Sequence, residues 1–210
     1  MKIKYTCSLG NRCQTSQLLK NNKLKNVSYP FDWVFSNCNI ILHCLEDDFK
    51  IFLDKSYYNS IHLNVCEHTY YYTKGCGCNM FNHKNPLDNE NDYNYYIRCV
   101  DRFKKLLKYE ELKLFIMIFD NMDNIEEKLK NDVIDFNNTF SKYTKNYKLL
   151  VIFHIQNKKE QNHIFTHYSN IDFLELHTFS SSGGVNFDYK NDNDYLNNII
   201  LEKYDFNFQN

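Results

Sequence analysis

The chain of 210 residues is poor in the residues that interrupt regular structure, with only two prolines and five glycines. This shortage argues against collagen-like sequence and against long linkers between domains. Basic and acidic side chains nearly cancel, 25 against 26. A chain with so little net charge is a poor candidate for binding the phosphate backbone of nucleic acids, so we expect no nucleic-acid partner.

Long hydrophobic runs are also missing. No stretch of about 18 apolar residues occurs, so we expect no membrane-spanning helix and no membrane partner. The first residues, Met1-Lys-Ile-Lys-Tyr-Thr6, are typical of a strand and not of a signal peptide. We therefore expect a cytoplasmic, reducing location, in which the eight cysteines are free thiols, metal ligands or a nucleophile and not a disulfide framework.

Apolar strands and amphipathic helices alternate along most of the chain. The predicted strands cover residues 3–7, 113–119, 148–155 and 172–179, and the predicted helices cover residues 14–24, 39–53, 93–108, 125–143 and 195–203. The two middle strands are nearly continuous apolar runs, which is typical of strands buried on both faces of a parallel sheet. The pattern predicts a single α/β domain over residues 1–210, with a mostly parallel central sheet and helices on both faces.

Residues 54–91 follow this alternation least. The segment is rich in Tyr, His and Cys and has no clear period. Long irregular excursions in compact domains often carry function, which makes this one a candidate lid or site wall. Its cysteines and histidines, Cys66, His68, Cys76 and Cys78, could also form a closed zinc site, although their spacing departs from the usual pairs. Zinc is the alternative here, and our main expectation is that no cofactor is needed.

Cys13 is the strongest candidate nucleophile, because it follows a predicted strand and a tight turn at the start of a predicted helix. The helix dipole and the unpaired backbone N–H groups there favour the thiolate, so we expect a pKa below the usual value. The backbone N–H groups of Gly10 and Cys13 are candidates for an oxyanion hole at the sheet edge where α/β proteins bind ligands. The alternative is that Cys13 is one of several partly buried structural cysteines.

A thiol nucleophile needs a histidine that takes its proton and a third group that orients this histidine. Sheet geometry favours His177 and His154, near the ends of predicted strands, over His83 in the irregular segment. A surface or structural role is the alternative for each of them. Asp32, which lies between two aromatic residues, could orient the histidine and is equally suited to capping the next helix.

Three runs in the chain carry a resemblance to a known family: Ser8-Leu-Gly-Asn-Arg-Cys13, Ser28-Tyr-Pro-Phe-Asp-Trp33 and Phe81-Asn-His83. Their order resembles that of a family described as putative papain-like cysteine peptidases, found in bacteria and large DNA viruses. The resemblance covers essentially the whole chain and implies a nucleophile at Cys13 and a base at His83. It also implies a papain-like α+β fold as the alternative to α/β. The composition, rich in Asn, Lys and Tyr, is similar to that of giant-virus proteins, for which the host cytoplasm is the expected location.

Two functions follow from these observations. The first is a cysteine-dependent hydrolase, a papain-like peptidase or an acyl transferase, with Cys13 as the nucleophile, His83 or His177 as the base and Asp32 as the orienting group. Its partner would be a protein or peptide substrate. The second is a non-catalytic viral interaction module with the segment 57–83 as its contact surface, held by zinc. The sequence leaves open the oligomeric state and whether the chain is an enzyme at all.

Overall fold

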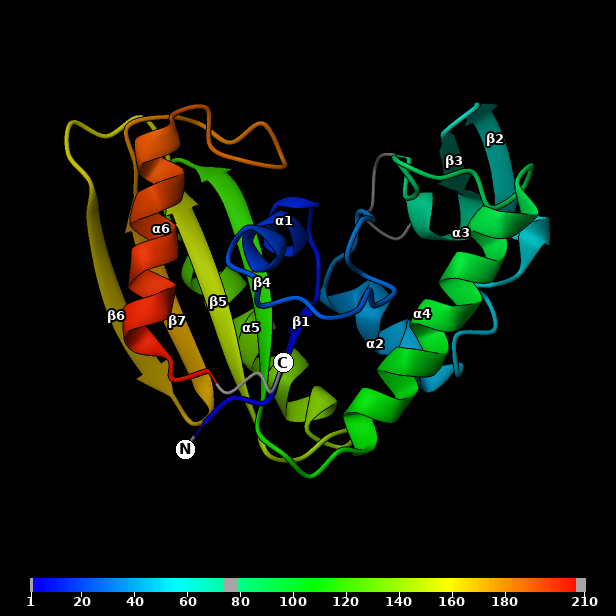
Figure 1. The fold of residues 1–210 in the computed structure, drawn as a ribbon, viewed down its shortest axis with the longest axis horizontal. Helices are drawn as coiled ribbons and strands as arrows, with labels where there is room; N and C mark the ends of the chain where they lie inside the picture. Colours follow the sequence, from blue (N-terminus) through cyan, green and yellow to red (C-terminus); the bar gives the residue numbers. More distant parts are fainter. Residues whose placement is uncertain (1, 74–78, 207–210) are drawn as a thin grey trace.

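A five-stranded sheet of order β1-β4-β5-β7-β6 forms the centre of the fold (Figure 1). The computed structural model describes residues 2–73 and 79–206. The strands are β1 (Tyr5–Ser8), β4 (Lys113–Met122), β5 (Tyr147–Ile155), β6 (Asn162–Tyr168) and β7 (Ile171–His177). All neighbours are parallel except β6, which pairs antiparallel with β7 at one edge. The predicted α/β fold is confirmed, and the α+β alternative does not describe this sheet.

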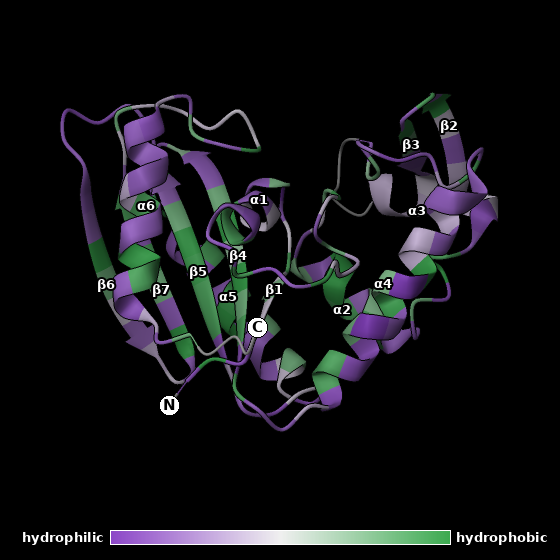
Figure 2. Ribbon diagram, viewed as in Figure 1, coloured by the Kyte–Doolittle hydropathy of each residue, from purple (hydrophilic) through white to green (hydrophobic). Residues whose placement is uncertain are grey.

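The apolar runs of the central strands are explained by helices on both faces of the sheet. On β4, Leu114 and Ile116 belong to the hydrophobic cluster that includes residues of α1 (Gln14–Asn21) and α6 (Lys190–Lys203). Phe115, between them, faces the opposite cluster with residues of α5 (Glu127–Phe140). Figure 2 shows the resulting hydrophobic colour along β4, β5 and β7. Residues that alternate along one strand are therefore buried on opposite sides.

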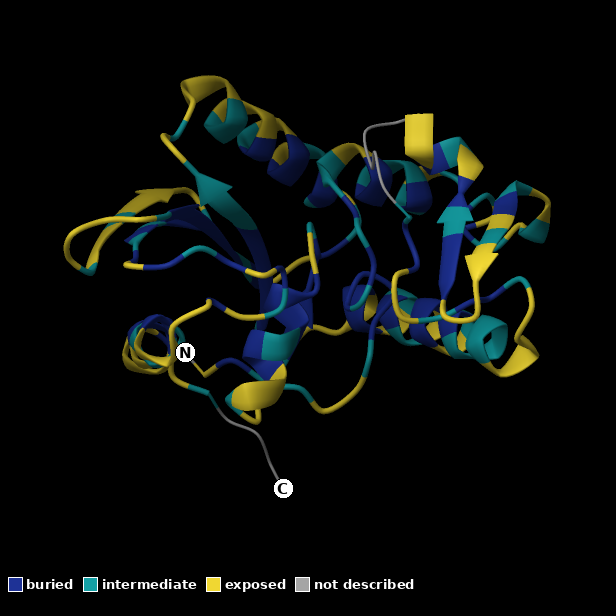
Figure 3. Cartoon of the chain, turned by 90° about the horizontal axis from the view of Figure 1, so that it is seen from above, coloured by how far each residue is buried: buried dark blue, intermediate teal, exposed yellow. Residues whose placement is uncertain are grey.

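The edge strand β6 was not predicted. Its residues are exposed except for Phe165, which is partly buried. Exposed residues are yellow in Figure 3. A strand with a single partly buried residue has no alternation of apolar and polar residues to reveal it. It therefore resembles a loop in the sequence, and only its pairing with β7 identifies it.

Between β1 and β4 the chain makes a long excursion that adds a second layer of structure beside the sheet (Figure 1). It holds α2 (Cys38–Glu46), η1 (Lys55–Tyr57), β2 (Tyr58–His62), β3 (Val65–His68), the short α3 (Thr69–Tyr71) and α4 (Glu90–Lys108). β2 and β3 form a separate antiparallel hairpin within the segment that showed no period in the sequence.

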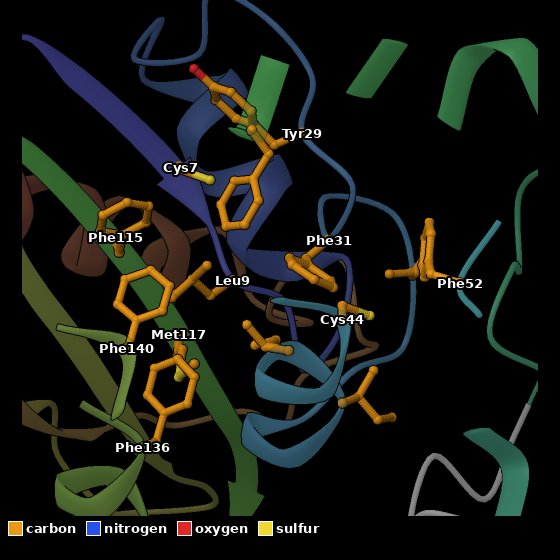
Figure 4. Close-up of a cluster of buried hydrophobic side chains, with 14 of the residues drawn as sticks. Cys7, Leu9, Tyr29, Phe31, Cys44, Phe52, Phe115, Met117, Phe136 and Phe140 are labelled. Atoms are coloured by element: carbon orange, nitrogen blue, oxygen red, sulfur yellow. The ribbon is translucent and has the colours of Figure 1, made fainter. Parts of the chain in front are cut away.

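A continuous series of aromatic contacts joins this excursion to the sheet. Phe115 of β4 lies 6.5 Å from Phe103 of α4, measured between ring centroids, and Phe103 lies 5.6 Å from Phe31. Phe31 contacts Phe52 at 6.3 Å, and Phe52 contacts Phe81 at 5.7 Å. Figure 4 shows Phe115, Phe31 and Phe52 in this buried cluster. Because interiors pack densely, the rings fix where the excursion lies relative to β1 and β4.

Two expectations about the chain's environment can be compared with the described residues. All six cysteines among them are free thiols: Cys7, Cys13, Cys38, Cys44, Cys66 and Cys99. In the same part of the chain, no helix has the length and apolar character needed to cross a membrane.

Candidate active site

The turn after β1 places Cys13 at the N-terminus of α1, as predicted. Gly10 and Asn11 both adopt left-handed backbone angles, with φ of 79° and 73°. A side chain at Gly10 would put its Cβ 2.2 Å from Oγ of Ser36, so glycine is required for the turn to pack against residues 31–36. Cys13 is the N-cap residue of α1.

The structure brings Cys13 and His83 into direct contact. Sγ of Cys13 lies 3.3 Å from Nε2 of His83, across 70 residues of sequence. Cys13 is 4% exposed, whereas His83 lies on the surface. A nucleophile and a histidine within hydrogen-bond reach are the two groups that covalent acyl transfer requires.

His83 is held in place by anchors two residues away on either side. Phe81 exchanges backbone hydrogen bonds with Cys66 of β3, at 3.0 and 2.9 Å, and its ring is fully buried. Asn85 is also fully buried, and its Nδ2 donates to Oγ of Ser60 at 2.7 Å. The segment between these anchors has little freedom, which explains how an irregular stretch can position a reactive side chain.

Asp32 does not contact His83. Its carboxylate accepts a hydrogen bond from the backbone N–H of Tyr29 at 2.7 Å and forms an ion pair with Lys25, also at 2.7 Å. Burial raises the pKa of Asp32, and the neighbouring Lys25 ammonium opposes this increase. Asp32 therefore does not orient the histidine directly. It does not cap the next helix either, because the N-cap of that helix is residue 37.

An aromatic contact takes the place of the expected carboxylate. The Trp33 ring packs edge-to-face against His83, with centroids 6.0 Å apart and planes at 87°. Nζ of Lys25 lies 4.8 Å from the Trp33 centroid, within the range of a cation–π contact. Asp32 is thus connected to His83 only indirectly, through Lys25 and Trp33.

The expected low pKa of Cys13 is wrong for this structure. Burial is the largest influence and raises the pKa of the thiol to about 11. The Arg12 guanidinium, the backbone N–H of Cys13 and the Lys25 ammonium lower it, but they do not outweigh the loss of solvent. The raised pKa favours the protonated thiol at neutral pH, and in that form Cys13 can donate to Nε2 of His83 when Nδ1 of His83 carries the ring proton.

One of the two proposed oxyanion donors is already occupied. The backbone N–H of Gly10 donates to Oγ of Ser8 at 3.1 Å. Gly10 therefore serves the geometry of the turn and not the binding of an oxyanion. Of the two proposed oxyanion donors, the backbone N–H of Cys13 at the helix N-terminus remains the candidate.

The two histidines favoured by sheet geometry lie elsewhere. Nε2 of His177 hydrogen-bonds to Oε1 of Glu175 at 2.7 Å, on a strand that β4 and β5 separate from β1. Three strand spacings amount to about 14 Å. His154 is fully buried, both of its ring nitrogens are hydrogen-bonded, and burial lowers its pKa to about 4. Neither histidine is placed to serve Cys13.

Two residues of the alternative zinc site, Cys66 and His68, lie among the described residues, and each hydrogen-bonds to a backbone carbonyl oxygen. The Cys66 thiol donates to the carbonyl oxygen of Glu67, and the buried His68 uses Nε2 to donate to the carbonyl oxygen of Ile51 at 3.0 Å. Burial lowers the pKa of His68 to about 4. Residues 2–73 and 79–206 contain no group of three or more His, Cys, Asp or Glu placed to hold a metal. The other two candidates, Cys76 and Cys78, lie outside the described residues.

Two charged contacts at the site were not foreseen. One is Lys25 beside Trp33, for which the sequence offers no signal. The other joins Nε of Arg12 to Oδ1 of Asp120 at 3.4 Å. Asp120 follows the apolar run of β4, at the strand end where α/β sheets bind ligands, and that position could have identified it.

The fold and the site together define a class: an α/β protein with a cysteine–histidine pair at the carboxyl end of its first strand. A model of the family described as putative papain-like cysteine peptidases matches residues 4–157. The chain belongs to this family, and the membership supports a cysteine hydrolase at the coarse level. The matched range includes Cys13 and His83 but not His177. Searches among curated proteins and among solved structures gave no match.

Proposed function

We propose that the protein is a cysteine-dependent hydrolase or acyl transferase in which Cys13 is the nucleophile and His83 the base. The 3.3 Å contact between Sγ and Nε2 carries the proposal. The family matched by the chain supports the same chemistry. The raised pKa of Cys13 means that the proton leaves the sulfur during attack, so His83 acts as a general base and not as the partner of a preformed thiolate.

In the first step, Sγ of Cys13 forms a bond to the carbonyl carbon of the substrate while Nε2 of His83 takes the thiol proton. The carbonyl π bond opens to an oxyanion, and in this proposal the backbone N–H of Cys13 donates to it. When the carbonyl re-forms, the bond to the leaving group breaks, and His83 returns the proton to that group. The product is a thioester on Cys13 and a free amine, alcohol or thiol.

In the second step, the thioester is transferred to an acceptor. His83 takes a proton from water, or from an incoming amine or alcohol, as the acceptor oxygen or nitrogen bonds to the acyl carbon. The bond to Sγ then breaks and the thiol recovers its proton from His83. A water acceptor makes the protein a hydrolase, and a peptide amide as substrate makes it a peptidase.

The Trp33 and Lys25 contacts complete the proposed mechanism. Because the Trp33 edge packs against the His83 ring, the imidazole is held toward Cys13 without a carboxylate partner. Lys25, fixed by Asp32, keeps the Trp33 ring in place. Asp32, Lys25 and Trp33 are positioning residues in this account.

The test is to trap the thioester with p-nitrophenyl acetate. We expect a rapid release of one equivalent of p-nitrophenol and a single acetyl group on Cys13 in the peptide mass spectrum. Cys13→Ala should abolish both. Cys38→Ala is the matched control, because Cys38 is partly exposed and would react by accessibility alone. Acetyl groups spread over several cysteines, or none at all, would contradict the proposal and favour a non-catalytic module.

A further inference from the structure

The charges around Cys13 are arranged so that the exposed one is positive. Two carboxylates lie near the site, and both side chains are nearly inaccessible: Asp32 is 1% exposed and Asp120 is 4% exposed. Each is paired with a cation. Lys25, the partner of Asp32, is itself 10% exposed, whereas the Arg12 side chain is 45% exposed. Of these four charged side chains, the Arg12 guanidinium is therefore the one that a substrate approaching the thiol can reach most readily.

Arg12 is placed to bind an anion while it keeps its protein partner. Its contact with Asp120 is made through Nε, and within the described residues no acceptor hydrogen-bonds to Nη1 or Nη2. Gly184 flanks the guanidinium, since a Cβ built there would lie 3.8 Å from Cδ and 3.9 Å from Nη1 of Arg12. The group thus lies between the end of β4 and the loop after β7, directly beside the nucleophile in the chain.

We infer that Arg12 is a specificity-determining residue that selects substrates with a carboxylate close to the carbonyl attacked by Cys13. The two outer guanidinium nitrogens form a planar fork that matches the two oxygens of a carboxylate. The inference rests on the proposed function, because it needs Cys13 as the nucleophile. It narrows the substrate to an acyl compound or peptide that carries a negative charge beside the scissile bond.

The experiment compares two alkylating reagents at Cys13. Iodoacetate and iodoacetamide form the same Sγ–carbon bond and release the same iodide, but only iodoacetate carries a carboxylate. We expect the iodoacetate-to-iodoacetamide rate ratio at Cys13 to exceed the ratio for free glutathione by roughly tenfold at low salt. The excess should shrink as salt is added, because an exposed charge is screened.

Three variants show whether Arg12 causes the excess. Arg12→Gln should return the ratio to that of glutathione, and Arg12→Lys should keep part of it, because the charge stays while the planar fork is lost. Lys20→Gln removes one exposed charge from the far end of the same helix and should leave the ratio unchanged. Using the ratio cancels any change in the thiolate fraction of Cys13, since both reagents depend on it equally.

Protection against iodoacetamide shows which carboxylate is recognised. Acetyl-Ala-Asp-amide carries only a side-chain carboxylate, acetyl-Ala-Ala with a free end carries only a main-chain carboxylate, and acetyl-Ala-Ala-amide carries neither. We expect one of the first two to slow the labelling of Cys13 in the wild type but not in Arg12→Gln. The peptide without a carboxylate should protect neither protein.

The outcomes separate this inference from the function on which it rests. If Cys13 reacts selectively but its reagent ratio is the same in the wild type and in Arg12→Gln, the carboxylate preference is wrong and the nucleophile stands. If Cys13 takes up neither reagent faster than Cys38 does, the proposed function fails, and the inference fails with it.

Discussion

The two members of the proposed catalytic pair come from regions that are built in different ways. Cys13 lies at the junction of a strand and a helix, where backbone hydrogen bonds of regular structure fix its place. His83 lies in an irregular stretch of the excursion and depends on the side chain of Asn85 and on two backbone bonds of Phe81. Cys13 is thus placed by secondary structure and His83 by tertiary contacts.

This difference explains why the excursion is so rich in aromatic residues. The 3.3 Å contact between Cys13 and His83 exists only if the excursion keeps its position against the sheet. The ring series from Phe115 through Phe103 to Phe81 provides that fixed position. The comparison predicts that changes on the excursion side alter the chemistry at Cys13, although none of them touches the sheet.

Replacing the base itself should have the largest effect. His83→Ala leaves the thiol without a proton acceptor, so we expect thioester formation from p-nitrophenyl acetate at pH 7 to slow by roughly 100- to 10,000-fold. The rate of p-nitrophenol release measures this. His177→Ala is the control on the sheet side and should keep the wild-type rate. Equal losses in the two variants would contradict the assignment of the base.

Asp32→Asn tests whether Asp32 positions Lys25 or acts directly on the imidazole of His83. The substitution leaves Lys25 nearly buried without its carboxylate, which should lower the free energy of unfolding by about 3 kcal/mol. Urea denaturation measures the loss. Asp132→Asn, in an exposed pair with Lys128, should leave the free energy of unfolding nearly unchanged. A large loss of rate at unchanged stability would instead show that Asp32 acts directly on the imidazole.

Acid should destabilise the excursion through His68 and the sheet through His154. The folded pKa of each is lowered from 6.5 to about 4, so the unfolded chain binds more protons between these values. The stability that each histidine contributes is therefore present above pH 6.5 and is lost as the pH falls toward 4. At pH 5 the loss amounts to about 2 kcal/mol for each histidine.

A substitution at His68 tests how much this residue contributes to the loss of stability in acid. In His68→Gln the difference in unfolding free energy between pH 7 and pH 5 should shrink by about 2 kcal/mol. The glutamine can still donate to the Ile51 carbonyl oxygen that His68 contacts. Denaturation curves at both pH values give the comparison. An unchanged difference would mean that His68 does not resist protonation in the folded protein.

Asn85→Ala removes an anchor of the segment that carries His83 and leaves His83 itself unchanged. The variant loses buried hydrogen bonds to Ser60 and Asp88, so we expect a loss of about 2 kcal/mol of stability and slower labelling of Cys13 by iodoacetamide. Asn59→Ala is the matched control, because Asn59 is an exposed asparagine of β2 that hydrogen-bonds to Glu67. It should change neither the stability nor the labelling rate. Fully retained labelling in Asn85→Ala would show that His83 does not need this anchor.

Trp33→Phe should have the smallest effect. A smaller ring weakens both the contact with His83 and the cation–π contact with Lys25, which together correspond to a threefold to tenfold slower thioester formation, or about 1 kcal/mol. The pH midpoint of Cys13 labelling should rise as well, because a displaced imidazole accepts the proton less readily. A midpoint identical to that of the wild type would limit Trp33 to a structural role.

The sequence predicted the parallel strands because burial on both faces leaves continuous apolar runs. It did not predict β6, which has only one partly buried residue, nor the hairpin of β2 and β3, whose burial follows no simple alternation. The apolar and polar pattern of a sequence reflects which residues are buried. Elements at the periphery of a fold bury few residues, so their sequences show little of this pattern.

The candidate site, like the fold, could be predicted only in part from the sequence. The position of Cys13 followed from local sequence, because a strand, a turn and a helix define it. The choice of His83 over His177 did not, since spacing cannot show where an excursion folds back, and only the family resemblance pointed to His83. The raised pKa of Cys13 and the indirect role of Asp32 depend on burial and on Lys25, which no local motif encodes.

The most direct test of the Cys13–His83 pair is the pH dependence of iodoacetamide labelling at Cys13, read by peptide mass spectrometry in the wild type and in His83→Ala. If His83 removes the proton as a general base, the wild type should label well below the thiol's pKa of about 11, and His83→Ala should label only at a higher pH, where the thiol ionises by itself. The same midpoint in both proteins would contradict the pair.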